Sequence, residues 1–280
     1  MYKTKLCMGT NAGYGIDIGD QISLLKQTGF EAFFTGRDNN IALYREIAEK
    51  NGMIYQSVHA PFRNAAKMWQ EGEEGLAATE ELLNCLRDCA RFDVPIMVAH
   101  TYIGFEDAHD PTGAGLENFS RVVEEAEKLN VKIAFENTEG EIYLAALMEK
   151  FKDCRNVGFC WDTGHELCYN KGKDMTALYG DRLICTHLND NLGISNFDGK
   201  IIWTDDLHLL PFDGINNWNG IVDRLNKCSY DDILTFELSK KSMPGRHDND
   251  KYANMKVEEY FAEAYNRACK VAKLKENRGM

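Results

Sequence analysis

Short β-rich segments alternate with longer amphipathic helical segments along the whole chain. Helical periodicity with one apolar face runs, for example, from Leu76 to Arg91 and from Val257 to the C-terminus. Between such segments, short runs of apolar and β-branched residues predict eight strands. These occupy residues 4–9, 30–36, 54–60, 95–101, 131–137, 157–163, 183–189 and 232–238.

This order of elements predicts the fold. Eight strand-then-helix units indicate a closed (β/α)8 TIM barrel of the α/β class, built as a single domain over residues 1–280. An open doubly wound sheet usually has fewer strands and a glycine-rich first turn. The turn after the first strand, GTNAGYG, is glycine-rich but lacks the GxGxxG spacing, so a dinucleotide cofactor is not expected.

The composition indicates which partners, cellular location and cysteine chemistry to expect. The chain has 32 Lys and Arg against 44 Asp and Glu, a net charge of −12, which disfavours an open basic surface for nucleic acid. It lacks an apolar stretch of signal-peptide or membrane-spanning length, so we expect a cytoplasmic protein without a membrane partner. The nine cysteines form no CxxC pair, which favours reduced thiols over disulfides or a thiolate zinc site.

Six predicted strands end in side chains that commonly bind metals. A single such residue is more often a hydrogen-bonded or solvated group, but six at one end of a barrel would share the mouth where barrel enzymes carry their active sites. Three carboxylates there need compensating cations or protons, and a bound divalent metal ion is the simplest explanation. The six residues are His59, His100, Glu136, Asp162, His187 and Glu237.

Strand alternation is consistent with this placement. Ala134 and Glu136 share one face of the fifth predicted strand, whereas Ile133 and Phe135 share the face expected to meet the helices. Small residues should therefore line the barrel interior beneath the carboxylates. The motifs WDTGH and DLH, which follow the sixth and seventh strands, add three more ligand-type side chains, His165, Asp206 and His208.

These motifs give the chain a resemblance to a known superfamily over nearly its whole length. The strings SVHAPF, MVAH, AFENTEG, CWDTGH, THLND, DLHLLPFDG and TFEL occur in the order and approximate spacing of the xylose-isomerase-like barrels, which include sugar epimerases, sugar-phosphate isomerases and endonuclease IV. The isomerase and epimerase branch implies one divalent ion (Mn, Zn, Co or Mg). Its ligands would be Glu136, Asp162, His187 and Glu237.

The same resemblance implies the reaction. A sugar, sugar phosphate or related small polyhydroxy compound would bind the ion through adjacent oxygens, while Glu136 and Glu237 remove and return a carbon-bound proton through an enediolate. His165 would contact a substrate oxygen. A barrel that binds a sugar-like ligand without turnover is a further alternative, which the intact glutamate pair disfavours.

Endonuclease IV supplies the main alternative, a zinc-dependent nuclease that acts on abasic DNA. Its nine ligands for three zinc ions correspond here to His59, His100, Glu136, Asp162, His165, His187, Asp206, His208 and Glu237. Two neighbouring ions could clamp a phosphodiester displacement. However, the stretches WQEGEEG and IGFEDAHDPTG near the predicted mouth are acidic, whereas a nuclease needs Lys and Arg to meet phosphates.

Several mouth-loop residues are candidates for substrate contacts. His59, His100, His165 and His208 are such candidates alongside any role as ligands. Trp69 and Trp203 could stack on a sugar ring, although core packing is an equal alternative for both. Basic residues beyond the strand ends could bind a carboxylate or phosphate or be solvated; they are Arg63, Lys67, Lys240, Lys241 and Arg246.

The sequence does not identify the substrate, because it departs from the epimerase pattern after the seventh predicted strand. Epimerases of the branch carry an arginine shortly after the seventh-strand histidine, where this chain has Asn189, Asp190 and Asn191. The sequence also leaves open whether the chain forms a homo-oligomer.

Overall fold

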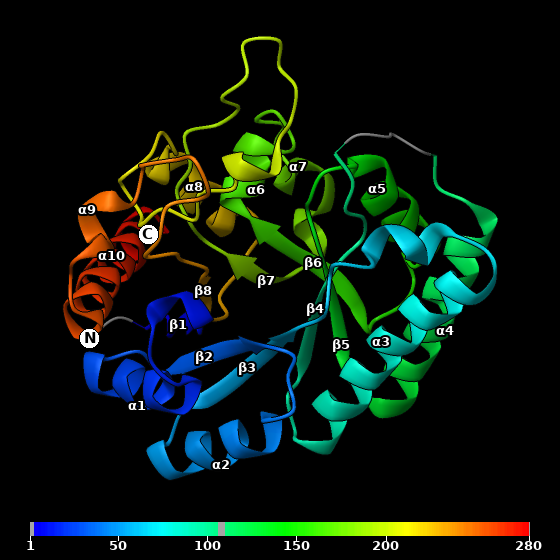
Figure 1. Ribbon diagram of the computed structural model, residues 1–280, viewed down its shortest axis with the longest axis horizontal. Coiled ribbons are helices and arrows are strands. Elements are labelled where there is room, and N and C mark those ends of the chain that lie inside the picture. Colours follow the sequence, from blue (N-terminus) through cyan, green and yellow to red (C-terminus); the bar gives the residue numbers. More distant parts are fainter. Residues whose placement is uncertain (1–2, 106–109, 280) are drawn as a thin grey trace.

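A computed structural model describes residues 3–105 and 110–279 and contains one eight-stranded parallel barrel with helices around its outside (Figure 1). The strands pair in the order β7-β6-β5-β4-β3-β2-β1-β8. This confirms the (β/α)8 barrel that the sequence predicts. The strands are β1 (Leu6–Gly9), β2 (Ala32–Gly36), β3 (Ile54–His59), β4 (Ile96–His100), β5 (Lys132–Glu136), β6 (Val157–Asp162), β7 (Leu183–His187) and β8 (Leu234–Phe236).

Helices follow the strands and are bounded by local capping signals. The Asp17 side chain accepts a hydrogen bond from the Gly19 amide at the start of the first helix, and Gly29 ends that helix at a positive φ of 122°. The helices are α1 (Ile18–Thr28), α2 (Ile41–Asn51), α3 (Gly72–Arg91), α4 (Gly113–Leu129), α5 (Glu141–Lys150), α6 (Thr163–Cys168), α7 (Thr176–Tyr179), α8 (Trp218–Lys227), α9 (Asp250–Ala253) and α10 (Val257–Arg278). Within the described residues, none of these helices is both long and apolar enough to cross a membrane.

In the described part of the chain, four short 3-10 helices lie in the connections between these elements. The second comes between β3 and α3, and the fourth lies in the long connection between β7 and α8. They are η1 (Ala12–Tyr14), η2 (Ala65–Trp69), η3 (Gly180–Arg182) and η4 (Trp203–Asp205).

The barrel closes between β7 and β8 through a seam with little regular pairing. A single parallel bridge joins Leu188 to Phe236. Beside it, the Thr186 hydroxyl takes the place of a backbone acceptor, because Thr235 N donates to Thr186 Oγ1 at 3.1 Å. This irregular seam shortens the eighth strand relative to the prediction of 232–238, so that Glu237 follows the last residue of β8 directly.

The buried apolar residues form an outer layer and a barrel interior. Ile133 and Phe135 belong to the large cluster between strands and helices, whereas Ala134 packs inside the barrel in a small cluster with Cys160 and Cys185. The alternation predicted for the fifth strand therefore holds. The interior combines small side chains with larger ones such as Ile96, Val98 and Phe34, and the candidate ligand residues lie at the carboxyl ends of the strands.

The long connection between β7 and α8 is held in place by one buried carboxylate. Asp190 is fully buried and accepts hydrogen bonds from the amides of Asn191, Phe212 and Asn216 and from the Trp218 indole, at 2.8 to 3.0 Å. Four donors compensate the loss of solvation of this charge. The connection carries Asp206 and His208 and is thereby fixed above the barrel mouth.

Candidate metal centre

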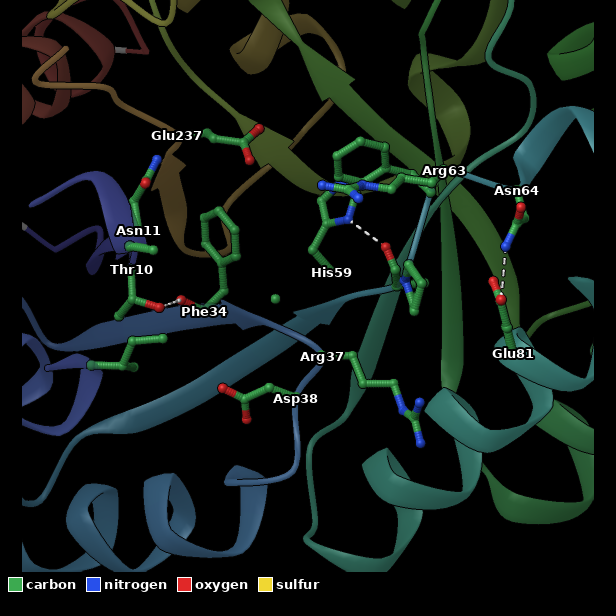
Figure 2. A pocket seen from close by; sticks show the side chains of 16 residues that line it. Thr10, Asn11, Phe34, Arg37, Asp38, His59, Arg63, Asn64, Glu81 and Glu237 are labelled. Carbon is green, nitrogen blue, oxygen red and sulfur yellow. Dashed lines mark hydrogen bonds between the residues drawn. The ribbon is translucent and has the colours of Figure 1, made fainter.

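The carboxyl ends of β3 to β8 bring six polar side chains to one mouth. Each of β3 to β7 ends at the residue that the sequence analysis selected, and Glu237 follows β8. Figure 2 shows His59 and Glu237 on this mouth, at the border of a cavity. The six are mostly buried in spite of their polarity; they are His59, His100, Glu136, Asp162, His187 and Glu237.

His187 lies at the middle of a four-residue group. Its Nδ1 atom is 3.1 Å from Glu136 Oε1 and 3.0 Å from Glu237 Oε2. With Asp162, these residues offer four ligand atoms that all lie within 4.8 Å of one another. Three carboxylate oxygens and one imidazole nitrogen at this spacing make a compact ligand set for a single divalent ion.

Two further groups flank this set. His59 Nε2 and His100 Nε2 lie 3.3 and 3.4 Å from Glu136 Oε2, on the side of β3 and β4. The remaining group is His165, Asp206 and His208, in which the two imidazole Nε2 atoms lie 3.3 and 3.0 Å from Asp206 Oδ2. In each group the potential ligand atoms lie within 4.8 Å of one another. The structure thus brings together all nine ligand-type residues that the sequence analysis selected.

Neighbouring histidines stabilise the negative charge of two of the carboxylates. Burial opposes ionisation of Glu136, but the charge of His187 holds the pKa of its carboxyl well below the usual value. Burial likewise opposes ionisation of Glu237, yet His187 lowers its pKa to about 2. For Asp162, burial is the larger effect and raises the pKa to about 6. The site is therefore rich in negative charge that is compensated by imidazole groups.

The residues present fit a divalent metal ion. Among the described residues, the ion-pair partners of Glu136 and Glu237 are all histidines, without Lys or Arg. Glu136 Oε2 and Asp206 Oδ1 are buried atoms without a hydrogen-bond partner, a state that costs free energy unless something satisfies them. Carboxylate and imidazole ligands together suit Zn, Mn and Co, and carboxylates also suit Mg.

Two asparagines hold Asp162, a candidate ligand, in place. Asn137 bridges β5 and β6, because its Oδ1 accepts from Asp162 N at 2.8 Å and its Nδ2 donates to Asp162 O at 2.9 Å. Asn189 Nδ2 donates to Asp162 Oδ2 at 2.8 Å, and His165 N donates to Oδ1 at 2.6 Å. These hydrogen bonds fix the orientation of the Asp162 carboxylate.

A cavity of about 330 Å³ lies over the centre. Trp203, which the sequence analysis selected, lines this cavity and is half exposed. Sequence reasoning missed Phe62, Tyr169 and Glu139, which also line it. Phe62 belongs to the SVHAPF motif and Glu139 to AFENTEG, so proximity to a strand end was the available signal. Burial raises the pKa of Glu139 to about 7.

Other predicted contacts do not join the centre. Trp69 is buried and its indole donates to Thr101 O at 2.7 Å, so it is a core residue and the stacking role does not fit its placement. Lys240 donates to Ala253 O at 2.9 Å and lines neither cavity that contains His59. Lys67 is ion-paired with Glu74. Arg246 is ion-paired with Asp205 and Asp248. Arg63 differs from these residues, because it lines a cavity together with His59 and Glu237.

Comparison with known proteins now places the chain. Residues 20–256 match the family described as Xylose isomerase-like TIM barrel. The chain belongs to this family. It is also 27% identical over 273 residues to the uncharacterized protein y4fM of Sinorhizobium fredii (strain NBRC 101917 / NGR234), with 80% of this chain and 82% of that protein covered.

Solved structures with a similar fold include sugar epimerases. The D-psicose 3-epimerase of Clostridium cellulolyticum H10 aligns with a TM-score of 0.72 at 16% identity, over 95% of this xylose isomerase-like chain and 99% of the epimerase. The 3-keto-D-glucoside 4-epimerase of E. coli aligns with a TM-score of 0.70 at 13% identity, over 95% and 99%. The IolI protein, solved with a zinc atom bound, aligns with a TM-score of 0.74 at 15% identity, over 96% and 98%.

Proposed function

We propose that this protein is a divalent-metal-dependent isomerase or epimerase of a sugar or a related small polyhydroxy compound. The observation that carries the proposal is the pair of glutamates on either side of His187, with Asp162 completing a four-residue ligand group. Two carboxylates at one ligand group are what a two-base proton transfer needs. The fold similarity to two sugar epimerases and to a protein with bound zinc supports the same class.

Glu136, Asp162, His187 and Glu237 would hold the ion, which supplies Lewis-acid polarisation of a substrate carbonyl when bound. One glutamate removes a proton from the carbon beside the carbonyl, and the C–H electron pair moves toward the carbonyl oxygen. The other glutamate returns a proton to the opposite face of that carbon in an epimerase, or a proton goes to the neighbouring carbon in an isomerase.

Three features of the chain favour this chemistry. The pKa of both glutamates lies below the usual value, because His187 opposes the effect of burial, so each carboxylate starts as a base. The cavity above them has aromatic walls from Phe62, Tyr169 and Trp203, which would keep water from a carbanion-like intermediate. His165 holds its Nδ1 at 3.0 Å from Asn137 O, which leaves Nε2 facing Asp206 and the cavity.

Proton exchange with solvent tests this proposal directly. Metal-loaded protein in D₂O should incorporate deuterium beside the carbonyl of at least one ketose in a panel of hexuloses, pentuloses and their phosphates, as measured by proton NMR. Protein treated with chelator and dialysed serves as the control. Lack of incorporation with every ketose and with Mn, Co, Mg and Zn would contradict the proposal.

A second candidate function is supported by the two flanking groups. His59, His100 and Glu136 form one, and His165, Asp206 and His208 form the other, so the mouth offers three adjoining sets of potential ligands. Three zinc ions could stabilise both the attacking and the leaving oxygen of a phosphodiester displacement. This arrangement supports a zinc-dependent endonuclease that acts on abasic DNA.

Metal content and a nicking assay separate the two candidates. For an isomerase or epimerase, we expect about one ion per chain by mass spectrometry and no cleavage of a duplex that carries one abasic site. About three zinc ions per chain, together with chelator-sensitive nicking at the abasic site, would favour the nuclease. A duplex of the same sequence without the abasic site is the control.

A further inference from the structure

We propose that a second cavity beside the metal centre binds a second, uncharged hydroxylated ring of the substrate, so that the preferred substrate is a glycoside or another two-ring sugar. This inference rests on the proposed function, because it concerns the substrate of the same site. It follows from the position of the cavity, from the chemistry of its walls and from one exposed aromatic side chain.

The second cavity adjoins the reacting end of the site. It has a volume of about 590 Å³ and extends over the carboxyl ends of β1, β2 and β3. His59, Phe62 and Glu237 line both this cavity and the one above the metal centre. Glu237 is one of the two proposed bases, so a substrate held at the centre borders the second cavity.

The combined space exceeds what a single sugar ring requires. The cavity above the centre, at about 330 Å³, already lies within the 300–1,000 Å³ range of pockets for small molecules. The second cavity is larger again. A monosaccharide bound through the metal ligands would leave it filled with water, whereas a second ring would occupy it.

The walls of the second cavity offer both donors and acceptors of hydrogen bonds. Figure 2 shows Asn11 and Arg63 on opposite sides of the cavity, where their N–H groups are donors. Asp38 and Glu81 supply carboxylate oxygens, and Asn64 Nδ2 donates to Glu81 at 2.7 Å. Sugar hydroxyl groups donate and accept at the same time, so a mixed lining of this kind suits them.

The charge balance disfavours an anionic ligand. Arg37 lines the cavity but is ion-paired with Asp88 at 2.7 Å. Glu237 faces His187 and the proposed ion, so Arg63 stands against the two remaining carboxylates of the lining, those of Asp38 and Glu81. A phosphate or carboxylate group would experience net repulsion there, whereas a neutral hydroxylated ring would not.

Phe62 points to a ring-shaped ligand. It is 43% exposed although it is a large apolar side chain, and it lies where the two cavities meet. One side of its ring is packed, because it stacks on His100 with centroids 5.0 Å apart and contacts the edge of His59 at 5.5 Å. A sugar presents an apolar C–H face that aromatic rings cover well.

Titration calorimetry on the metal-loaded full chain tests the inference. The probes are sucrose, maltose, cellobiose and lactose, their component monosaccharides, and D-glucose 6-phosphate and D-glucuronate as anionic single rings. We expect at least one disaccharide to bind about tenfold or more tightly than either of its components, a difference of about 1.4 kcal/mol.

A pair of glycine-to-phenylalanine variants, one inside the second cavity and one outside it, tests whether this cavity binds the second ring. Gly36 lines this cavity, and a Cβ atom added there meets no heavy atom within 4 Å, so Gly36→Phe places a ring in open space. We expect Gly36→Phe to remove most of the disaccharide advantage. The control is Gly113→Phe, which adds the same ring at the start of α4, where the space is also open, and which should leave that advantage intact.

Three results would overturn the inference. These are no disaccharide that binds more tightly than its components, an anionic monosaccharide that binds more tightly than every disaccharide, or a Gly36→Phe variant that weakens mono- and disaccharides by the same factor. Failure of the proposed function looks different. In that case the disaccharide advantage and its loss in Gly36→Phe persist, but no ketose of the panel described above exchanges a C–H proton with D₂O.

Discussion

Replacing Glu237 by glutamine is expected to lower the rate of C–H exchange between a ketose substrate and D₂O by at least about 100-fold, the lower end of what a positioned acid–base group contributes. The amide keeps the size of the side chain but has no basic oxygen that can take a proton. Glu237 lies 3.0 Å from His187 and borders both cavities, so it is placed to meet substrate. Exchange is measured by proton NMR.

Because Glu237 is also a proposed ligand, the assay must separate proton transfer from metal loss. It is run with the metal in excess, and the bound metal is measured by mass spectrometry on the same sample. Glu149→Gln removes a carboxylate from the surface of the barrel, where Glu149 pairs with Lys152, and should exchange at the rate of the unmodified protein. A metal-loaded Glu237→Gln protein with full exchange would rule out the two-base mechanism.

Removal of the metal is expected to abolish activity and to lower the melting temperature. Glu136 and Asp162 are fully buried, and their negative charges are best compensated by a divalent ion. An ion at 100 times its Kd stabilises the folded chain by about 2.7 kcal/mol. For a chain of this size, that difference corresponds to about 5–10 °C in Tm. Differential scanning calorimetry with and without chelator measures it.

The matched variant for this experiment is Asp162→Asn. It retains a polar side chain of the same shape but removes one charge from the four-residue ligand group. We expect the metal-dependent rise in Tm to shrink in this variant, whereas Asp181→Asn, on the surface in η3, should keep the full rise. An equal rise in all three proteins would place the stabilising ion elsewhere in the molecule.

The amino-acid sequence was sufficient to predict the fold and to place the candidate site at one mouth of the barrel. Alternation with period two identified the barrel strands, and the residues at their ends identified the mouth. Ala134 inside the barrel and Phe135 outside it lie where alternation puts them. These predictions succeed because the direction of a strand side chain depends on the local backbone, and because parallel barrel strands all end at the same face.

The positions and contacts of loop side chains could be assigned only from the tertiary structure. Trp69 and Trp203 looked equivalent in the sequence, but Trp69 packs against Phe119 and Tyr143 in the core while Trp203 borders the cavity over the metal centre. Arg63 and Lys240 also looked equivalent, yet one lines a cavity and the other donates to the backbone of Ala253. A loop has no fixed period, so distant packing partners set the direction of its side chains.

The sequence by itself therefore determined the barrel and the nine ligand-type residues, which follow from strand periodicity and motif order. Only the tertiary structure decided that these nine form three adjoining groups with Glu136 at their centre, and that a second cavity opens beside Glu237. The physical reason is that distances between side chains on different strands depend on barrel closure and on loop packing, which no local pattern in the chain encodes.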